Sequence, residues 1–414
     1  MIALYIILIF LLILSFYVII HKKWGISLYL IAVYLLSVTT SIFDAENIEI
    51  IDYISPFSGL VFCILFFFIF KPFIKTEPSI LGFENQKQCN AFVKIGTILS
   101  LILIFGMLLQ ITLISDAFCY GLANVRDDMY NEYSSQKKMS FFESIGSGIV
   151  GYLKGTSFTL VLMFFYALCF IKGHSKLKFL LIIASLSGAY SGILLGGRTQ
   201  TMYWMMYVIF AFILFRNNIP KKEKRILYIV LGSLFCIMVA YFIFMSILRV
   251  ALSDSSASEF ILEYTSQIIP NFCNYVDNFN MTDFTLARIF PNIDYYINGT
   301  FDTIAHNDKN YMATGIIAFN FTTFVGDLME DIGWGVILYI ACFFYIAKHC
   351  TRKKVYSVSD LIYLGLIYQI PLHGLFYNSL GNRWATLGIV FSILIAKYLT
   401  SKITVEKKNV QNEC

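Results

Sequence analysis

The chain alternates between long apolar runs and short polar segments. Eleven runs are almost free of charged residues and have about the length, roughly 20 residues, that a helix needs to cross a bilayer. Within lipid a chain must satisfy its own backbone hydrogen bonds, so each run predicts a membrane-spanning helix. The predicted spans are 1–20, 26–42, 56–70, 93–114, 156–171, 177–195, 201–215, 226–248, 332–347, 361–380 and 384–399.

Composition supports the same class of protein. Of the 414 residues, 58% are apolar and 14% are charged, against roughly 45–50% and about 25% in soluble domains. These values exclude a water-soluble enzyme and a disordered chain. The fold class expected is therefore an all-α polytopic membrane protein with about 11 transmembrane helices, forming a single membrane domain over residues 1–414.

Charge alternates from one predicted loop to the next, and this predicts the orientation. One set of alternate loops and helix ends holds 22 of the 31 Lys and Arg residues but only 6 of the 26 Asp and Glu residues. Lys and Arg favour the cytoplasmic side, so we expect the N-terminus outside and the C-terminus inside. Basic clusters such as 221–225 are then membrane anchors, and no nucleic-acid partner is expected. Two long outer loops follow, 115–155 and 249–331, the second forming a small helical cap.

The arginines on the predicted outer side depart from this charge rule. They are Arg126, Arg198, Arg249, Arg288 and Arg383. Arg198 follows the turn Gly196-Gly197 after a helix whose small residues recur every four positions, a pattern that allows close helix packing. A guanidinium group matches phosphate oxygens bidentately, so these arginines are candidates for binding a phosphate. The alternative is that they snorkel at the interface or pair with carboxylates of the outer loops.

Three further residues are candidates for acid–base chemistry. His373 lies in the outer half of a predicted span, two residues after Pro371, and an ionisable residue at such depth suggests function. Asp327 and Asp331 precede another span and share one helix face. The alternatives are a neutral histidine bonded to a backbone carbonyl, and carboxylates that favour the start of a helix because of its macrodipole.

Several of these motifs resemble the O-antigen polymerase family, the oligosaccharide repeat-unit polymerases of Wzy type. The segment Gly196-Gly197-Arg198-Thr199 is similar to that family's turn after a small-residue helix, and 324–335 (FVGDLMEDIGWG) is similar to its segment before a late helix. Arg126 lies where such proteins often carry an outer arginine. The architecture of about eleven helices with two large outer loops is similar as well.

The resemblance implies a glycosyltransferase of the bacterial cytoplasmic (inner) membrane. Such enzymes join polyprenyl-pyrophosphate-linked oligosaccharide units, as donor and acceptor, into O-antigen or capsule polysaccharide on the outer face of the membrane. The outer arginines would bind the pyrophosphate, and His373, Asp327 or Asp331 would take the proton of the acceptor hydroxyl. An activated sugar needs no ATP, so we expect no cofactor, and no cluster of metal-ligand residues appears on the predicted outer side, so we expect no metal. A chain-length regulator and a flippase are partners that this resemblance allows.

Two other functions remain open from the sequence. An O-antigen ligase uses the same chemistry on a different acceptor. A transporter or flippase for lipid-linked oligosaccharide would instead require ionisable residues along a central pathway and internal repeats. The predicted spans carry few charges, and no repeat is visible, which favours the enzyme.

Overall fold

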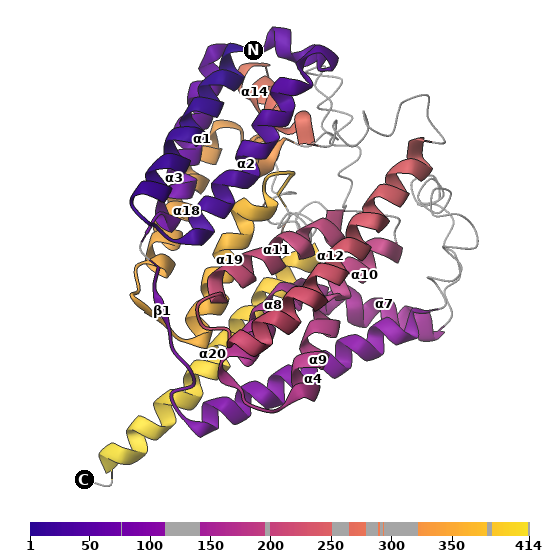
Figure 1. Ribbon diagram of the computed structural model, residues 1–414, viewed down its shortest axis with the longest axis vertical. Coiled ribbons are helices and arrows are strands. Elements are labelled where there is room, and N and C mark those ends of the chain that lie inside the picture. Colours follow the sequence, from indigo (N-terminus) through magenta and orange to yellow (C-terminus); the bar gives the residue numbers. More distant parts are fainter. Residues whose placement is uncertain are drawn as a thin grey trace. The chain divides into compact units, whose positions relative to one another are not determined.

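The computed structural model describes residues 1–75, 77–111, 141–194, 199–250, 265–278, 289, 293, 322–378 and 383–412. These residues form helices almost throughout, joined by short turns (Figure 1). An all-α membrane-protein fold is thereby confirmed for the described part of the chain. Its strand content there is one two-stranded parallel pair, in which Ser79 lies opposite Val355 and Ile80 opposite Tyr356.

The helices are bounded as follows. They are α1 (Ile2–Ile20), α2 (Gly25–Phe43), α3 (Pro56–Phe70), α4 (Gln86–Leu109), α7 (Phe141–Leu153), α8 (Ser157–Phe170), α9 (Ser175–Ser185), α10 (Ser187–Leu194), α11 (Thr199–Phe215), α12 (Lys221–Val250), α14 (Ile268–Asn278), α17 (Thr323–Ile332), α18 (Val336–Thr351), α19 (Val358–His373) and α20 (Arg383–Asn412). The strands are β1 (Ser79–Ile80) and β2 (Val355–Tyr356), and short 3₁₀ turns occupy Ala45–Asn47, Glu49–Tyr53, Lys71–Phe73, Lys154–Thr156 and Gly333–Gly335.

Eight helical stretches of the described residues are long and apolar enough to cross a membrane. They are Ile2–Ile20, Gly25–Phe43, Pro56–Phe73, Gln86–Leu109, Ser144–Phe170, Ser175–Leu194, Lys221–Tyr241 and Thr323–Thr351. Each overlaps one of the eleven predicted spans. The other three predicted spans also form helices, as α11, α19 and α20, of which α11 has 17 residues and α19 has 16. The protein is therefore a multi-pass membrane protein, while the count of eleven and the orientation stay predictions.

The chain divides into two compact units, each built from separate segments. Unit 1 comprises Met1–Pro78, Ser258–Lys354 and Ile367–Thr386, and unit 2 comprises Ser79–Ala257, Val355–Leu366 and Leu387–Cys414. The division between the two units therefore falls within α19 and within α20. The expectation of one membrane domain over residues 1–414 is not decided by this division.

Unit 1 is organised around an aromatic core. Helix α1 packs on α2 and α3, and the Tyr34 ring lies 5.1 Å from Phe66 and 5.3 Å from Phe70. Helix α14 packs against α2 and α3, where Phe272 meets Phe62 and Phe66 edge-on. This short helix belongs to the predicted outer loop 249–331, yet its apolar residues are buried inside the unit.

Unit 2 surrounds helix α8. Every residue from Ser157 to Leu168 is buried, because α9 and α11 cover this helix. Helix α7, from the predicted outer loop 115–155, leads into α8 through the Lys154–Thr156 turn, so the span begins earlier than the apolar run predicts. Residues 112–140 lie outside the described residues, as do 251–264 and most of 279–321. The helical cap therefore stays a prediction.

Candidate functional site

Helix α17 carries three acidic residues and is buried along its length. Asp327 is 5% exposed, while Glu330 and Asp331 are 0% exposed. Buried carboxylates are costly unless they are hydrogen-bonded or neutralised, so their environment matters for function. Apolar side chains at these buried positions would carry no such cost in free energy.

Each of the three carboxylates accepts a hydrogen bond from a different segment of unit 1. The backbone N–H of Asn378 donates to Asp327 Oδ2 at 2.6 Å, and the Tyr275 hydroxyl donates to Glu330 Oε1 at 2.7 Å. The backbone N–H of Ile289 donates to Asp331 Oδ2 at 3.3 Å. We call Asp327, Glu330 and Asp331 the carboxylate cluster. These bonds tie α17 to α14, to the segment after α19 and to Ile289 in the middle of the predicted outer loop 249–331.

The start of α17 is fixed by backbone hydrogen bonds to the segment after α19. Phe324 N–H donates to the Gly374 carbonyl at 2.7 Å, and the N–H groups of Thr322 and Thr323 donate to the Phe376 carbonyl at 3.1 and 3.3 Å. The first N–H groups of a helix have no partner within it, so this contact satisfies them. Thr323 adopts φ 74°, a strained conformation for a β-branched residue. The surrounding bonds hold it there.

His373 ends α19 at the head of this same segment and is 0% exposed. Gly374 follows it because a Cβ there would collide with Phe324 and with the Ile370 carbonyl. One turn earlier, the Tyr34 hydroxyl donates to the Pro371 carbonyl at 2.8 Å. The structure thus brings the segment of His373 against the helix of Asp327 and Asp331, although about 45 residues separate them in sequence.

The macrodipole interpretation of the acidic residues is not supported by the geometry of α17. The first turn of this helix holds no acidic residue, and Asp331 lies in its last turn, where the dipole disfavours negative charge. The helix also ends there, because Gly333 takes φ 51° and ψ −134° and separates α17 from α18. The position of the three acidic residues is better explained by their burial and their hydrogen-bond partners.

The predicted phosphate-binding residues are only partly within the described structure. Arg126, Arg198, Arg288 and the turn residues Gly196 and Gly197 lie outside the described residues. Arg249 lies near the end of α12 and Arg383 begins α20, so their backbone is helical, while their side chains lie outside the description. Phosphate binding by these arginines stays a prediction.

The small-residue helix before Arg198 packs as its spacing predicts. Gly188 and Gly192 are buried, and a Cβ on Gly188 would lie 3.1 Å from Ser157 Oγ of α8. On the same side of α10, Lys154 Nζ donates to Ser191 Oγ at 3.2 Å. Gly388 of α20 approaches Gly155 so closely that no Cβ would fit between them. Lys154 is therefore a cation whose side chain contacts α10, the helix that precedes the Gly-Gly-Arg turn in sequence.

Sequence reasoning missed Lys154, Tyr275 and Asn378. Lys154 was hidden because the predicted span began after it. Tyr275 could have been found, since Ile268, Phe272 and Tyr275 have the spacing of one buried helix face. The role of Asn378 could not have been found from the sequence. Its backbone N–H donates to Asp327, which lies 51 residues away along the chain.

The described residues contain no group of three or more His, Cys, Asp or Glu side chains that could hold a metal ion. The three members of the carboxylate cluster accept hydrogen bonds from three separate segments of unit 1. Each carboxylate of the cluster can therefore accept a proton or a hydrogen bond independently of the other two. No family model, no curated protein and no solved structure matches this chain.

Proposed function

We propose that this protein is a membrane glycosyltransferase that polymerises polyprenyl-pyrophosphate-linked oligosaccharide repeat units on the outer face of a bacterial cytoplasmic membrane. The observation that carries the proposal is the buried carboxylate cluster of α17, held against the segment that contains His373. Its support from sequence is the resemblance of the Gly-Gly-Arg turn and of the α17 segment to repeat-unit polymerases.

The proposed reaction is a displacement at an anomeric carbon. The hydroxyl oxygen of the acceptor sugar forms a bond to the anomeric carbon of the donor chain, and the bond from that carbon to the pyrophosphate oxygen breaks. The hydroxyl proton passes to a base, and polyprenyl pyrophosphate leaves with the bonding electron pair. A positioned base contributes typically about 100–10,000-fold to such a step.

His373, Asp327 and Asp331 are the proposed bases. Asp327 is proposed as a base because the backbone N–H of Asn378 donates to its Oδ2 and so orients the carboxylate. Glu330 is bound by the Tyr275 hydroxyl and serves to position α14 against α17. His373 is the alternative base on the neighbouring segment.

The proposed binding groups for the pyrophosphate are the outer arginines, led by Arg198. Negative charge grows on the leaving group as its bond breaks, so fixed guanidinium groups stabilise the transition state more than the ground state. Arg249, Arg383, Arg126 and Arg288 are proposed as further contacts. The proposal includes eleven spans with the C-terminus inside, since this places the arginines outside.

The test is a reconstituted reaction. The purified full chain is supplied with lipid-linked repeat units, and both the glycan ladder and the released polyprenyl pyrophosphate are measured. We expect one pyrophosphate released for each new linkage. A single transfer to a lipid core acceptor without a ladder would indicate the ligase instead. His373→Gln tests His373 as the base, because it keeps a hydrogen bond and removes basicity; near-native turnover would exclude His373 and leave Asp327 and Asp331.

A transporter of lipid-linked oligosaccharide is the second candidate, and one observation favours it. The span Thr323–Thr351 is interrupted at Gly333, and its first half carries buried carboxylates, features that transporters use to couple ions to substrate movement. The same reconstitution separates the two functions. A transporter would move labelled lipid-linked units across vesicles in response to a pH gradient and release no pyrophosphate.

A further inference from the structure

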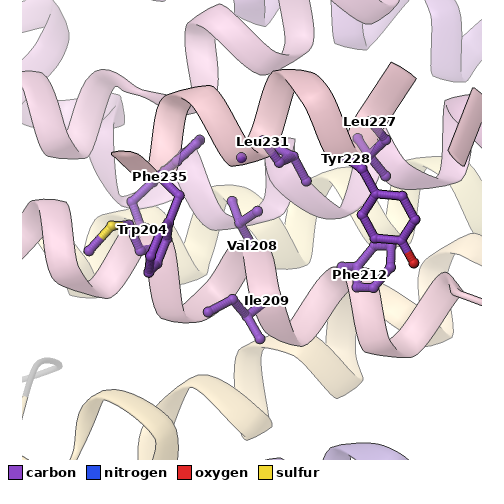
Figure 2. Close-up of a pocket in the computed structure, with 10 residues that line it drawn as sticks. Trp204, Val208, Ile209, Phe212, Leu227, Tyr228, Leu231 and Phe235 are labelled. Carbon is purple, nitrogen blue, oxygen red and sulfur yellow. The ribbon is translucent and has the colours of Figure 1, made fainter. Parts of the chain in front are cut away.

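Helices α11 and α12 enclose an apolar groove in unit 2. It has a volume of about 240 Å³ and is lined by Trp204, Val208 and Phe212 of α11 and by Leu227, Leu231 and Phe235 of α12. Figure 2 shows Trp204 and Phe235 at one end, with Phe212, Leu227 and Tyr228 at the other. Helix α12 is otherwise little covered by the protein, because only 6% of its apolar window is buried.

A second groove lies on the neighbouring face of α12. It has a volume of about 380 Å³, and its walls include Phe164 and Leu168 of α8, Ile182 of α9, and Ile226 and Val230 of α12. Leu227 lines both grooves, so the two run side by side along the first half of α12. The first groove is apolar, and the second is apolar except for Ser175, Lys178 and Glu223, so the pair can take the two acyl chains of a phospholipid.

The end of α12 nearest the grooves is strongly basic. Lys221, Lys222 and Arg225 are exposed there, and Lys178 of α9 lies at the same end, where Glu223 is 3.7 Å from its Nζ. Cations are mildly disfavoured at a helix N-terminus by the macrodipole, so an anion bound beside these side chains would be stabilised. Basic pockets between membrane helices are suited to anionic lipid head groups.

The length of the first groove fits one leaflet. Leu227 and Phe235 are eight residues apart on α12, which corresponds to about 12 Å along the helix axis. One leaflet supplies about 15 Å of the 30 Å hydrocarbon core. We propose that the two grooves bind the acyl chains of one anionic phospholipid, whose phosphate is held by Lys221, Lys222 and Arg225.

The test measures lipid binding to the purified full chain in a neutral detergent. Dioleoylphosphatidylglycerol and dioleoylphosphatidylcholine are added separately, and thermal unfolding and native mass spectrometry are recorded. We expect the anionic lipid to raise Tm and to be retained at one molecule per chain, since a ligand that binds the folded state stabilises it. Equal stabilisation by the two lipids would overturn the proposal.

Two variants test the grooves and the basic end independently of activity. Gly232 lines the first groove, and a Cβ added to it would have no other atom within 4 Å, so Gly232→Leu fills the groove without a clash and favours the helix. Lipid binding should fall at least about tenfold. The triple change Lys221→Gln, Lys222→Gln, Arg225→Gln should weaken binding of the anionic lipid about 100-fold, since each basic side chain contributes about fivefold.

The matched control for the groove variant is Gly148→Leu. Gly148 is also a helical glycine of unit 2 with nothing within 4 Å of a Cβ, but it lies on α7 and lines neither groove. It should bind the anionic lipid as the unaltered chain does. If Gly232→Leu binds as tightly as Gly148→Leu, no acyl chain occupies the groove.

Discussion

Helices α17 and α12 place their charged residues in opposite ways. Helix α12 keeps its basic residues at one end, where Lys221, Lys222 and Arg225 are exposed, and leaves its apolar body largely uncovered. Helix α17 has its acidic residues inside the fold, and every side chain from Thr323 to Asp331 is buried. The charges of α12 serve its placement in a bilayer, whereas those of α17 oppose such placement. Function should therefore be sought first at α17.

The largest expected effect comes from neutralising a carboxylate of α17. Asp327→Asn should lower polymer formation about 100–10,000-fold, because the amide oxygen still accepts the Asn378 N–H but the side chain no longer takes a proton. The measurement is pyrophosphate release by the purified protein.

The matched control for this change is Asp44→Asn. Asp44 is also a buried carboxylate of unit 1, and it accepts a hydrogen bond from Ser266 Oγ at 2.6 Å. Its variant should retain turnover within about threefold, since the proposal gives Asp44 no part in proton transfer. Equal losses in the two variants would mean that Asp327 only supports the fold.

The next effect concerns the predicted phosphate contact before α11. Arg198→Ala should lower turnover about 100–1000-fold, and Arg198→Lys should restore part of it, because a point charge lacks the bidentate fork. The size-resolved surface polysaccharide of a complemented null strain reports the result. Lys22→Ala, which changes an exposed basic residue of unit 1, is the control. A full-length ladder from Arg198→Ala would refute the phosphate role.

A stability effect should follow from the contact between α17 and the segment of His373. Gly374→Ala should destabilise the protein by about 1–3 kcal/mol, because its methyl group would collide with Phe324 and the Ile370 carbonyl. Thermal unfolding in detergent measures this. Gly148→Ala, with open space around its Cβ, should leave Tm unchanged or raise it. If Gly374→Ala left Tm unchanged, the contact between Gly374 and Phe324 would be loose enough to admit a methyl group.

The smallest change in stability is expected from a substitution in the apolar part of α12. Ile229 is 64% exposed, so Ile229→Ala should change the free energy of unfolding by no more than about 0.5 kcal/mol. The comparable change on α17, Leu328→Ala, removes a fully buried side chain and should cost about 2–5 kcal/mol. Similar losses at the two positions would show that α12 is covered by protein in the assembled molecule.

The sequence predicted the helices better than the site. Long apolar runs are a local signal, so all eleven predicted spans correspond to helices, with shifted boundaries such as the earlier start before Ser157. Helix α14 lies in the predicted outer loop 249–331, which the sequence predicts to form a cap of short helices, but its packing partners were not predicted. In the structure Pro270 and Asn271 are buried together with the apolar residues of this helix, which packs against α3.

The site depended on contacts that no local pattern reveals. Asp327 and Asp331 could be selected from their spacing, but the backbone N–H groups that bind them belong to Asn378 and Ile289, in distant parts of the chain. The same holds for His373, whose approach to α17 rests on backbone bonds from Phe324 to Gly374. Such pairings are decided by tertiary packing and not by the residue types involved.

The backbone contact at the start of α17 also limits what this helix can attract. A helix normally offers its first amide hydrogens as a positive pole to incoming anions. Here the amides of Thr322, Thr323 and Phe324 are already engaged by the oxygens of Gly374 and Phe376. These three amides are therefore not open to an anion, and under the proposed function the diphosphate is neutralised by cations that other segments of the chain supply.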